Sequence, residues 1–229
     1  MADRSARSLR PRADTPVLVI GLGRFGAATA GQLDRLGREV LVVDEDETLV
    51  QKWGDRVTHA VQADASSLEA LQQIGAQNFG VAIVGVGSDV EASVLIVANL
   101  VDLGVGEIWA KASSESHGRI LTRIGAHHIV RPEREAGETT AHLVSGRMLD
   151  FIELDDDFVI VKMWPPQSIQ GVSLTASGVR TKFRVTVVGV KAPGSPFTYA
   201  TNETVVTADD LILVSGTGAD IERFAALGG

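Results

Sequence analysis

Cysteine is absent from this 229-residue chain. The protein therefore has no thiolate metal site, no thiol nucleophile and no disulfide framework. The absence also favours a reducing compartment, because disulfides belong mainly to oxidising ones. With 45% hydrophobic and 22% charged residues, the composition is that of a globular protein that can bury a core without such cross-links.

Long apolar runs are missing as well. A bilayer span needs about 18 consecutive apolar residues, whereas the helix-like stretch 92–101 is interrupted by Asn99 and followed by Asp102. Residues 1–14 lack the apolar segment of a secretory signal and are predicted to form a flexible, arginine-containing tail. If the protein acts at a membrane, we expect it to do so through a partner.

Basic residues are in the minority. The 21 Lys and Arg residues against 29 Asp and Glu residues give a net charge of −8. A surface of this sign repels the phosphates of nucleic acids. Nucleic acid is therefore not an expected partner.

Short apolar runs alternate with helix-like segments from residue 17 to residue 130. Val17–Ile20 is a continuous apolar run, typical of a strand buried on both faces of a parallel sheet. Arg24–Leu36 carries apolar residues at helical spacing until Gly37. Five more strands are expected, at Val40–Val43, Ala60–Gln62, Val81–Val84, Ile108–Ala110 and His128–Val130. This alternation predicts an α/β fold, a Rossmann-like doubly wound parallel sheet.

The pattern changes near residue 150. A long helix is predicted over Glu133–Leu149, and the later segments are rich in Val and Thr and separated by Gly, Pro and Ser. They comprise strand-like runs at Phe158–Met163, Arg184–Val190, Glu203–Val206 and Leu211–Val214 and a closing helix at Ala219–Leu227. We therefore expect a first domain over residues 15–150, including the long helix, and a smaller α+β domain over residues 151–229.

A glycine-rich turn follows the first predicted strand and opens the first predicted helix, Gly21-Leu22-Gly23-Arg24-Phe25-Gly26. In a G-x-G-x-x-G motif of this context, the glycines permit a tight turn, close approach of a pyrophosphate and close packing of the helix. The exposed amides and the helix dipole favour phosphates. Asp44 ends the second predicted strand at the spacing of a carboxylate that holds ribose hydroxyls and repels a 2′-phosphate. Together these features predict a nucleotide-binding site.

Arg24 lies within the glycine turn. A guanidinium at this position suits a terminal phosphate, because it is a permanent cation with a planar fork of donors. The alternative is a solvent-facing residue of the first helical turn.

Several segments together resemble the RCK domain of bacterial Ktr/Trk potassium-uptake regulatory subunits. The first is the stretch from Val17 to Gly26. The others are Gln62-Ala63-Asp64-Ala65-Ser66, Lys111, His117–Ile124 with Gly125-Ala126, Arg131-Pro132-Glu133, and Thr207–Val214 with Gly216. The resemblance covers nearly everything from Thr15 on, as an N-terminal and a C-terminal RCK domain.

This resemblance implies a cytoplasmic, non-enzymatic subunit at the inner face of the membrane. Dimers would assemble into an octameric ring docked on a membrane-embedded potassium-translocating subunit. Nucleotide exchange would gate that subunit, with ATP and ADP in Ktr-type rings or NADH and NAD in Trk-type rings. Arg24 favours the Ktr type. The residues expected to contact the nucleotide are Gly21, Leu22, Gly23, Arg24, Phe25, Gly26, Asp44, Asp64, Ala65, Ser66, Gly85 and Lys111.

The resemblance implies two further ligands. Glu133 would hold a divalent cation, Mg or Ca, between ATP-bound subunits, unless it only complements the dipole of its helix. Cyclic di-AMP would bind near Val179 and Arg180 of the C-terminal domain, unless that segment is an exposed basic turn.

Two departures from the family pattern affect these expectations. His127 stands where an aspartate is usual and is followed by His128. Adjacent strand residues face opposite ways, so the two histidines make a poor paired metal site, and a polar edge position is expected for them. Gln62 and Ala63 stand where glycine is common, which weakens the expected adenine-side contacts of residues 64–66.

An NAD-dependent oxidoreductase is the alternative from another class. Such an enzyme needs a proton-transfer group beside the nicotinamide. Residues 151–229 contain no histidine, and His117 is the most plausible acid–base residue of the first domain, where packing or helix capping is the alternative role. A third possibility is an NADH sensor that acts on a Trk-type or other transporter.

Overall fold

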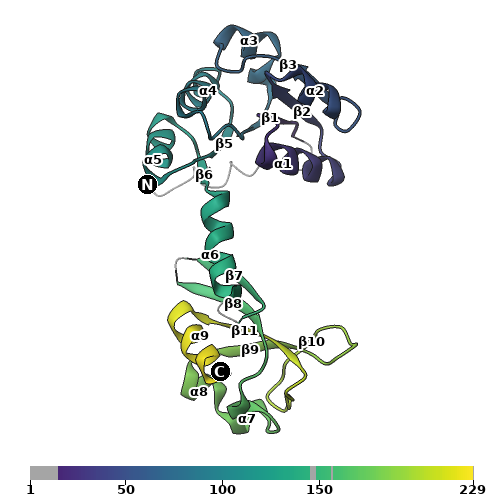
Figure 1. Ribbon diagram of the computed structural model, residues 1–229, viewed down its shortest axis with the longest axis vertical. Helices are drawn as coiled ribbons and strands as arrows, with labels where there is room; N and C mark the ends of the chain where they lie inside the picture. Colours follow the sequence, from purple (N-terminus) through teal and green to yellow (C-terminus); the bar gives the residue numbers. More distant parts are fainter. Residues whose placement is uncertain (1–14, 145–147, 156, 229) are drawn as a thin grey trace, which may run out of the picture. The chain divides into compact units, whose positions relative to one another are not determined.

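The chain folds into two compact units, which divide between Glu133 and Arg134 in a computed structural model (Figure 1). The structure describes residues 15–144, 148–155 and 157–228. The expected N-terminal tail and Asp156 lie outside the described residues. The sequence analysis placed the domain boundary at residue 150, with the long helix in the first domain. In the structure, most of that helix, α6 (Pro132–Val144), belongs to the second unit.

The first unit contains a six-stranded parallel sheet with the strand order β3-β2-β1-β4-β5-β6. Its strands are β1 (Val17–Ile20), β2 (Val40–Asp44), β3 (His59–Gln62), β4 (Val81–Val84), β5 (Glu107–Lys111) and β6 (His128–Val130). Its helices are α1 (Arg24–Arg35), α2 (Glu47–Trp53), α3 (Leu68–Gln73), α4 (Val90–Asp102) and α5 (Glu115–Ile124). The doubly wound prediction is confirmed.

Both faces of this sheet are covered, which explains the continuous apolar strands. Leu18 and Ile20 of β1 pack in one core with residues of α3, α4 and α5. Val17 and Val19 face the other way and pack with residues of α1 and α2. Because successive side chains of a strand alternate between faces, only an uninterrupted apolar run satisfies both cores.

The second unit contains a five-stranded antiparallel sheet in the order β10-β9-β11-β8-β7. Its strands are β7 (Asp150–Asp155), β8 (Phe158–Met163), β9 (Thr186–Lys191), β10 (Thr198–Tyr199) and β11 (Leu211–Thr217). Short helices α7 (Leu174–Ser177) and α8 (Val179–Phe183) precede β9, and α9 (Gly218–Ala225) follows β11. The α+β prediction for this unit is confirmed.

Three predicted elements are wrong in part. Leu149 is not helical, because its N–H pairs with the carbonyl of Lys162 beside β8. Arg184 does not begin a strand, because its φ of +60° ends α8 instead. Glu203–Val206 forms isolated bridges rather than a strand, since its carbonyls accept from Gly171 in a loop and from Leu174 at the start of α7.

Candidate nucleotide-binding site

The turn between β1 and α1 is shaped by the lack of side chains. Gly21 has a φ of +89°, in the left-handed region that favours glycine. A Cβ on Gly26 would lie 1.9 Å from the carbonyl oxygen of Gly21, and a Cβ on Gly85 would lie 3.0 Å from the same atom. Gly85 follows β4, so the turn and this neighbouring strand end pack backbone against backbone.

The mouth of the turn is open. Gly23 is the exposed N-cap of α1, and a Cβ built on it would meet nothing within 4 Å. Among the described residues, no side chain caps this helix, and its first turn contains no acid. The first-turn amides are therefore available to an anion, as in other phosphate sites at helix N-termini. Arg24 is exposed beside them, and Phe25 is half-buried.

Asp44 ties this turn to the end of β2. Its Oδ2 accepts a hydrogen bond from the backbone N–H of Leu22 at 2.5 Å, and its Oδ1 accepts one from Asp46 N–H at 2.9 Å. Leu22 itself is buried in the core. Each carboxylate oxygen has a second lone pair, so Asp44 can fix the loop and still accept from a hydroxyl.

The turn after β3 is organised by Asp64. Its Oδ1 accepts from the N–H and the hydroxyl of Ser66, at 2.9 and 2.6 Å, and these bonds hold the pKa of Asp64 below its usual range. Ala65 is buried, so its side chain belongs to the core. Asn99 of α4 donates to the Ser66 carbonyl at 2.8 Å. In the sequence, Asn99 was noticeable only as a polar residue that interrupts an apolar helical run. That interruption was the one sign that its side chain bonds to another segment.

Lys111 and Glu133 form an ion pair at the end of β5, with 2.8 Å between Nζ and Oε1. The Lys111 bond lowers the pKa of the Glu133 carboxyl, and the charge of Arg24 adds a smaller effect in the same direction. The lysine stem lies against Gly87, where a Cβ would come within 3.2 Å of it. Cations from the glycine turn and from β5 thus both influence one carboxylate.

Metal ligands do not gather in the part of the chain that the structure describes. No group of three or more His, Asp or Glu side chains could hold an ion there. Glu133, the expected ligand of a divalent cation, is engaged by Lys111. A cation at Glu133 would therefore need donors from elsewhere, such as phosphates or a second copy.

His117, His127 and His128 occupy packed or edge positions. His117 is buried; its Nδ1 accepts from Ser113 N–H at 3.3 Å, and its Nε2 has no hydrogen-bond partner among the described residues. Desolvation lowers the pKa of His117. His127 accepts from Ile108 N–H, whereas His128 stacks on Trp109 with ring centroids 3.9 Å apart. The two adjacent histidines therefore serve separate contacts.

Val179 and Arg180 lie in the second unit, at a cavity of about 240 Å³. Val179 is 3% exposed and belongs mainly to the core, whereas Arg180 is exposed. Threonine, asparagine and aliphatic side chains complete the wall: Leu174, Thr175, Thr181, Val187, Ala200, Thr201 and Asn202. The cavity thus combines one cation with hydroxyl, amide and apolar surface.

The family model of the TrkA-N domain matches residues 17–132. The Ktr system potassium uptake protein C of Bacillus subtilis is 34% identical over 207 residues, 90% of this chain and 94% of that protein. The crystal structure of the GsuK RCK domain superposes with a TM-score of 0.65 at 18% identity, covering 94% of this chain and 48% of that one. The GsuK channel bound to NAD superposes at 0.63 and 17%, covering 94% and 40%.

None of the helices among the described residues is long and apolar enough to cross a bilayer. The family-model match and the 34% identity over most of both chains show common descent, and the superposition shows a shared fold. The chain is therefore a member of the TrkA-N family, among the relatives of the Ktr system potassium uptake proteins.

Proposed function

We propose that this chain is a cytosolic regulatory subunit of a potassium-uptake system, switched by ATP and ADP and without enzymatic activity. The observation that carries the proposal is the open glycine turn, which presents free helix amides and the exposed Arg24, and whose Leu22 N–H is bound by the Asp44 carboxylate. The relationship to Ktr proteins over 90% of the chain supplies the physiological context.

Preference for ATP follows from the cations around the turn. Arg24 offers a fork of donors to a terminal phosphate, and Lys111 lies where a phosphate could compete with Glu133 for its ammonium group. The third phosphate of ATP would therefore replace the Glu133 carboxylate as the anionic partner of Lys111. ADP would lack the group that reaches these cations.

NAD and NADH are the alternative ligands, and the Asp44 carboxylate is compatible with their binding. A carboxylate after the second strand can accept both ribose hydroxyls of an adenosine half, which ATP, ADP and NADH share. Direct titration of the purified protein with ATP, ADP, NADH and NAD separates the two proposals. Tighter binding of ATP and ADP supports the ATP/ADP switch. Tighter binding of NADH supports a switch that responds to NADH and NAD.

Assembly and partner belong to the same proposal. Dimers of this chain would form an octameric ring on a membrane-embedded potassium-translocating subunit, at the inner face of the membrane. A divalent cation, Mg or Ca, would join Glu133 to the nucleotide phosphates of two copies, which would free Lys111 for a phosphate. The particle mass measured with ATP and Mg²⁺, and again after chelation, tests the ring and the role of the cation.

The second unit would bind a further regulator, cyclic di-AMP, in the cavity beside Arg180. A guanidinium can pair with a phosphodiester while Val179 and Val187 pack on a base. Titration of cyclic di-AMP into the nucleotide-saturated protein tests this site. Arg180→Ala should abolish that binding and leave ATP affinity unchanged.

An oxidoreductase role is disfavoured by the state of His117. The residue is 2% exposed, and its Nδ1 accepts from the Ser113 N–H. A proton-transfer group has to reach a substrate directly or through one water. This histidine is better suited to packing, which supports a binding protein over a dehydrogenase.

A further inference from the structure

Arg184 ends the helix α8 in a conformation that residues with side chains rarely adopt. Its φ is +60°, and it is the one non-glycine residue with a positive φ in the part of the chain that the structure describes. The Cβ of an L-residue is crowded in this region, so glycine is the favoured residue. Other contacts must therefore hold Arg184 there.

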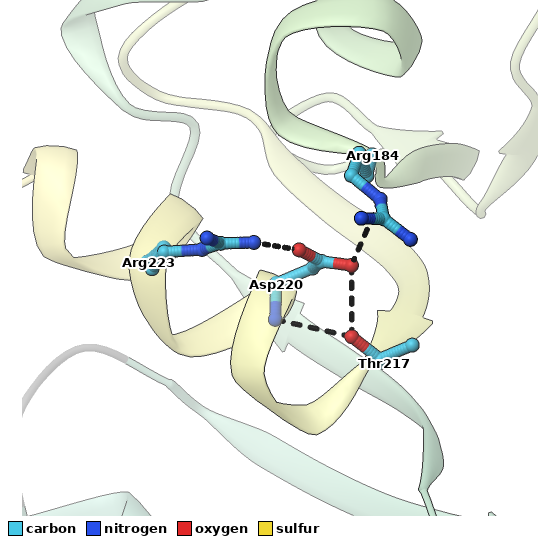
Figure 2. A network of polar contacts seen from close by, with 4 residues as sticks. All are labelled: Arg184, Thr217, Asp220 and Arg223. Carbon is cyan, nitrogen blue, oxygen red and sulfur yellow. Dashed lines mark hydrogen bonds and ion pairs between the residues drawn. The ribbon is translucent and has the colours of Figure 1, made fainter.

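The Arg184 side chain, itself 74% exposed, forms an ion pair with a buried carboxylate, shown in Figure 2. Asp220 of α9 has a side chain only 5% exposed, and its Oδ2 lies 3.7 Å from the Arg184 Nε. Thr217 donates its hydroxyl to Oδ2 at 2.8 Å, and Arg223 pairs with Oδ1. The Thr217 bond and the two arginines keep the pKa of Asp220 below its usual range. A buried charge needs such partners, since desolvation without them is costly.

The pair joins two separate elements. Arg184 belongs to the end of α8, whereas Thr217, Asp220 and Arg223 belong to α9 and its cap. A Cβ on Gly216 would approach the Arg184 carbonyl to 3.5 Å, and the rings of Phe183 and Phe224 lie 5.4 Å apart. The end of α8 therefore lies against α9, with the Phe183–Phe224 contact near the end of α9 and the Arg184–Asp220 ion pair near its start.

Helix α8 also forms one wall of the 240 Å³ cavity. Val179, Arg180 and Thr181 line that cavity, whereas Arg184 and Asp220 are not among the described residues that do. The helix has five residues between the left-handed Gly178 and Arg184. A helix this short has little stability of its own, so its position depends on how its ends are held.

We propose that the Arg184–Asp220 pair is a positioning latch that sets the α8 wall and thereby the affinity of the cavity for its ligand. The lining suits an anion that carries a flat apolar ring, because Arg180 supplies the cation while Val179 and Val187 supply apolar surface. This inference rests on the proposed second ligand, with cyclic di-AMP as its probe. Arg184 acts through α8 and does not touch the ligand.

Two arginine variants of the full chain separate positioning from general stability. Arg184→Gly removes the latch while placing the residue that best tolerates the backbone, so the fold should be retained. Arg223→Ala is the matched control, because it removes a guanidinium from the same carboxylate but leaves α8 tied to α9. Binding of cyclic di-AMP, binding of ATP and amide exchange of residues 178–184 are measured for each variant.

Arg184→Gly is expected to weaken cyclic di-AMP binding about tenfold, to speed amide exchange in α8 and to leave ATP affinity unchanged. Arg223→Ala should change the cyclic di-AMP affinity by less than about threefold. Equal losses in the two variants, or unchanged α8 exchange in Arg184→Gly, overturn the latch. If the unaltered protein binds no cyclic di-AMP, the proposed second ligand fails, and the exchange comparison still decides the latch.

Discussion

In the first unit the ligand-facing turn is shaped by residues without side chains, whereas in the second unit the wall of the cavity is held by the charged side chains of Arg184 and Asp220. Backbone packs on backbone at Gly26 and Gly85, where a Cβ would lie 1.9 and 3.0 Å from the Gly21 carbonyl oxygen. At Arg184, an unfavourable backbone conformation is retained because a buried carboxylate pairs with the side chain.

These two constructions fail in opposite ways. A turn made of glycines is sensitive to added atoms, because close-packed backbone cannot move aside cheaply. A latch made of charges is sensitive to atoms removed and to protonation, because a buried charge left without a partner is costly. Substitutions can therefore break one unit's site while leaving the other as an internal control.

Gly26→Ala should have the largest effect. The new Cβ would lie 1.9 Å from the Gly21 carbonyl oxygen, so the turn must open, and nucleotide affinity should fall by more than about 100-fold. The free energy of unfolding of the first unit should fall by about 1–3 kcal/mol. Calorimetric titration and denaturant unfolding measure both. Gly23→Ala is the control for the unfolding measurement only, since its Cβ meets no protein atom within 4 Å. Equal loss of unfolding free energy in both variants would contradict the packing argument.

Asp44→Asn should have the second-largest effect on nucleotide affinity. An amide offers only one acceptor oxygen, so either the Leu22 N–H or the Asp46 N–H loses its partner, and the ribose loses a charged acceptor. Affinity for ATP, ADP and NADH should all fall by about 10- to 100-fold, as expected for hydrogen bonds to a charged group. Asp46→Asn is the matched control, because an asparagine still caps α2. Unchanged affinity in Asp44→Asn would place the ribose elsewhere.

Arg24→Ala should have a smaller and more selective effect. ATP affinity should fall about tenfold, and ADP affinity by less than about threefold, because only ATP carries the terminal phosphate. Arg35→Ala, at the other end of α1, serves as the control, since Arg35 bonds only to Gln32 among the described residues. Equal losses for the two nucleotides would remove the terminal-phosphate role from Arg24.

Acidification should produce the smallest effect and separate the two units. Burial lowers the pKa of His117 from 6.5, so the unfolded chain binds a proton first, and stability of the first unit falls as the pH drops below about 6.5. Asp220 has a lowered pKa too, so its contribution is lost only in the acid range, as pH falls through that pKa. As the pH falls, the first unit should lose stability at a higher pH than the second. Amide exchange of residues in each unit measures the two stabilities. His117→Gln should remove most of the pH dependence of the first unit's stability. If the variant loses stability with pH as the unaltered protein does, another group is responsible.

Local patterns were enough to predict much of this molecule. The strands Val17–Ile20, Val81–Val84 and His128–Val130 agree with the structure residue for residue. For the first two, the reason is that a strand covered on both faces has to be apolar throughout. The glycine turn was also predictable, since strand, turn and helix are contiguous in the chain.

Other features depend on groups far apart in the sequence. Lys111 meets Glu133 across 22 positions, and Asn99 reaches Ser66 across 33. Nothing local to Arg184 announces a left-handed conformation, because Asp220, which stabilises it, lies on another element. The strand assigned to Glu203–Val206 was wrong for the same reason, since its partners are Gly171 in a loop and Leu174 at the start of α7.

The sequence alone determined the doubly wound sheet, the glycine turn with Asp44 behind it and the resemblance to potassium-uptake regulators. These properties arise from periodicity and from contiguous motifs, in which each residue's neighbours along the chain are also its neighbours in space. Only the tertiary structure decided that Asp44 holds the Leu22 N–H, that His117 is buried and that a carboxylate holds Arg184 at the end of α8. Burial and long-range pairing exist only after the chain has folded.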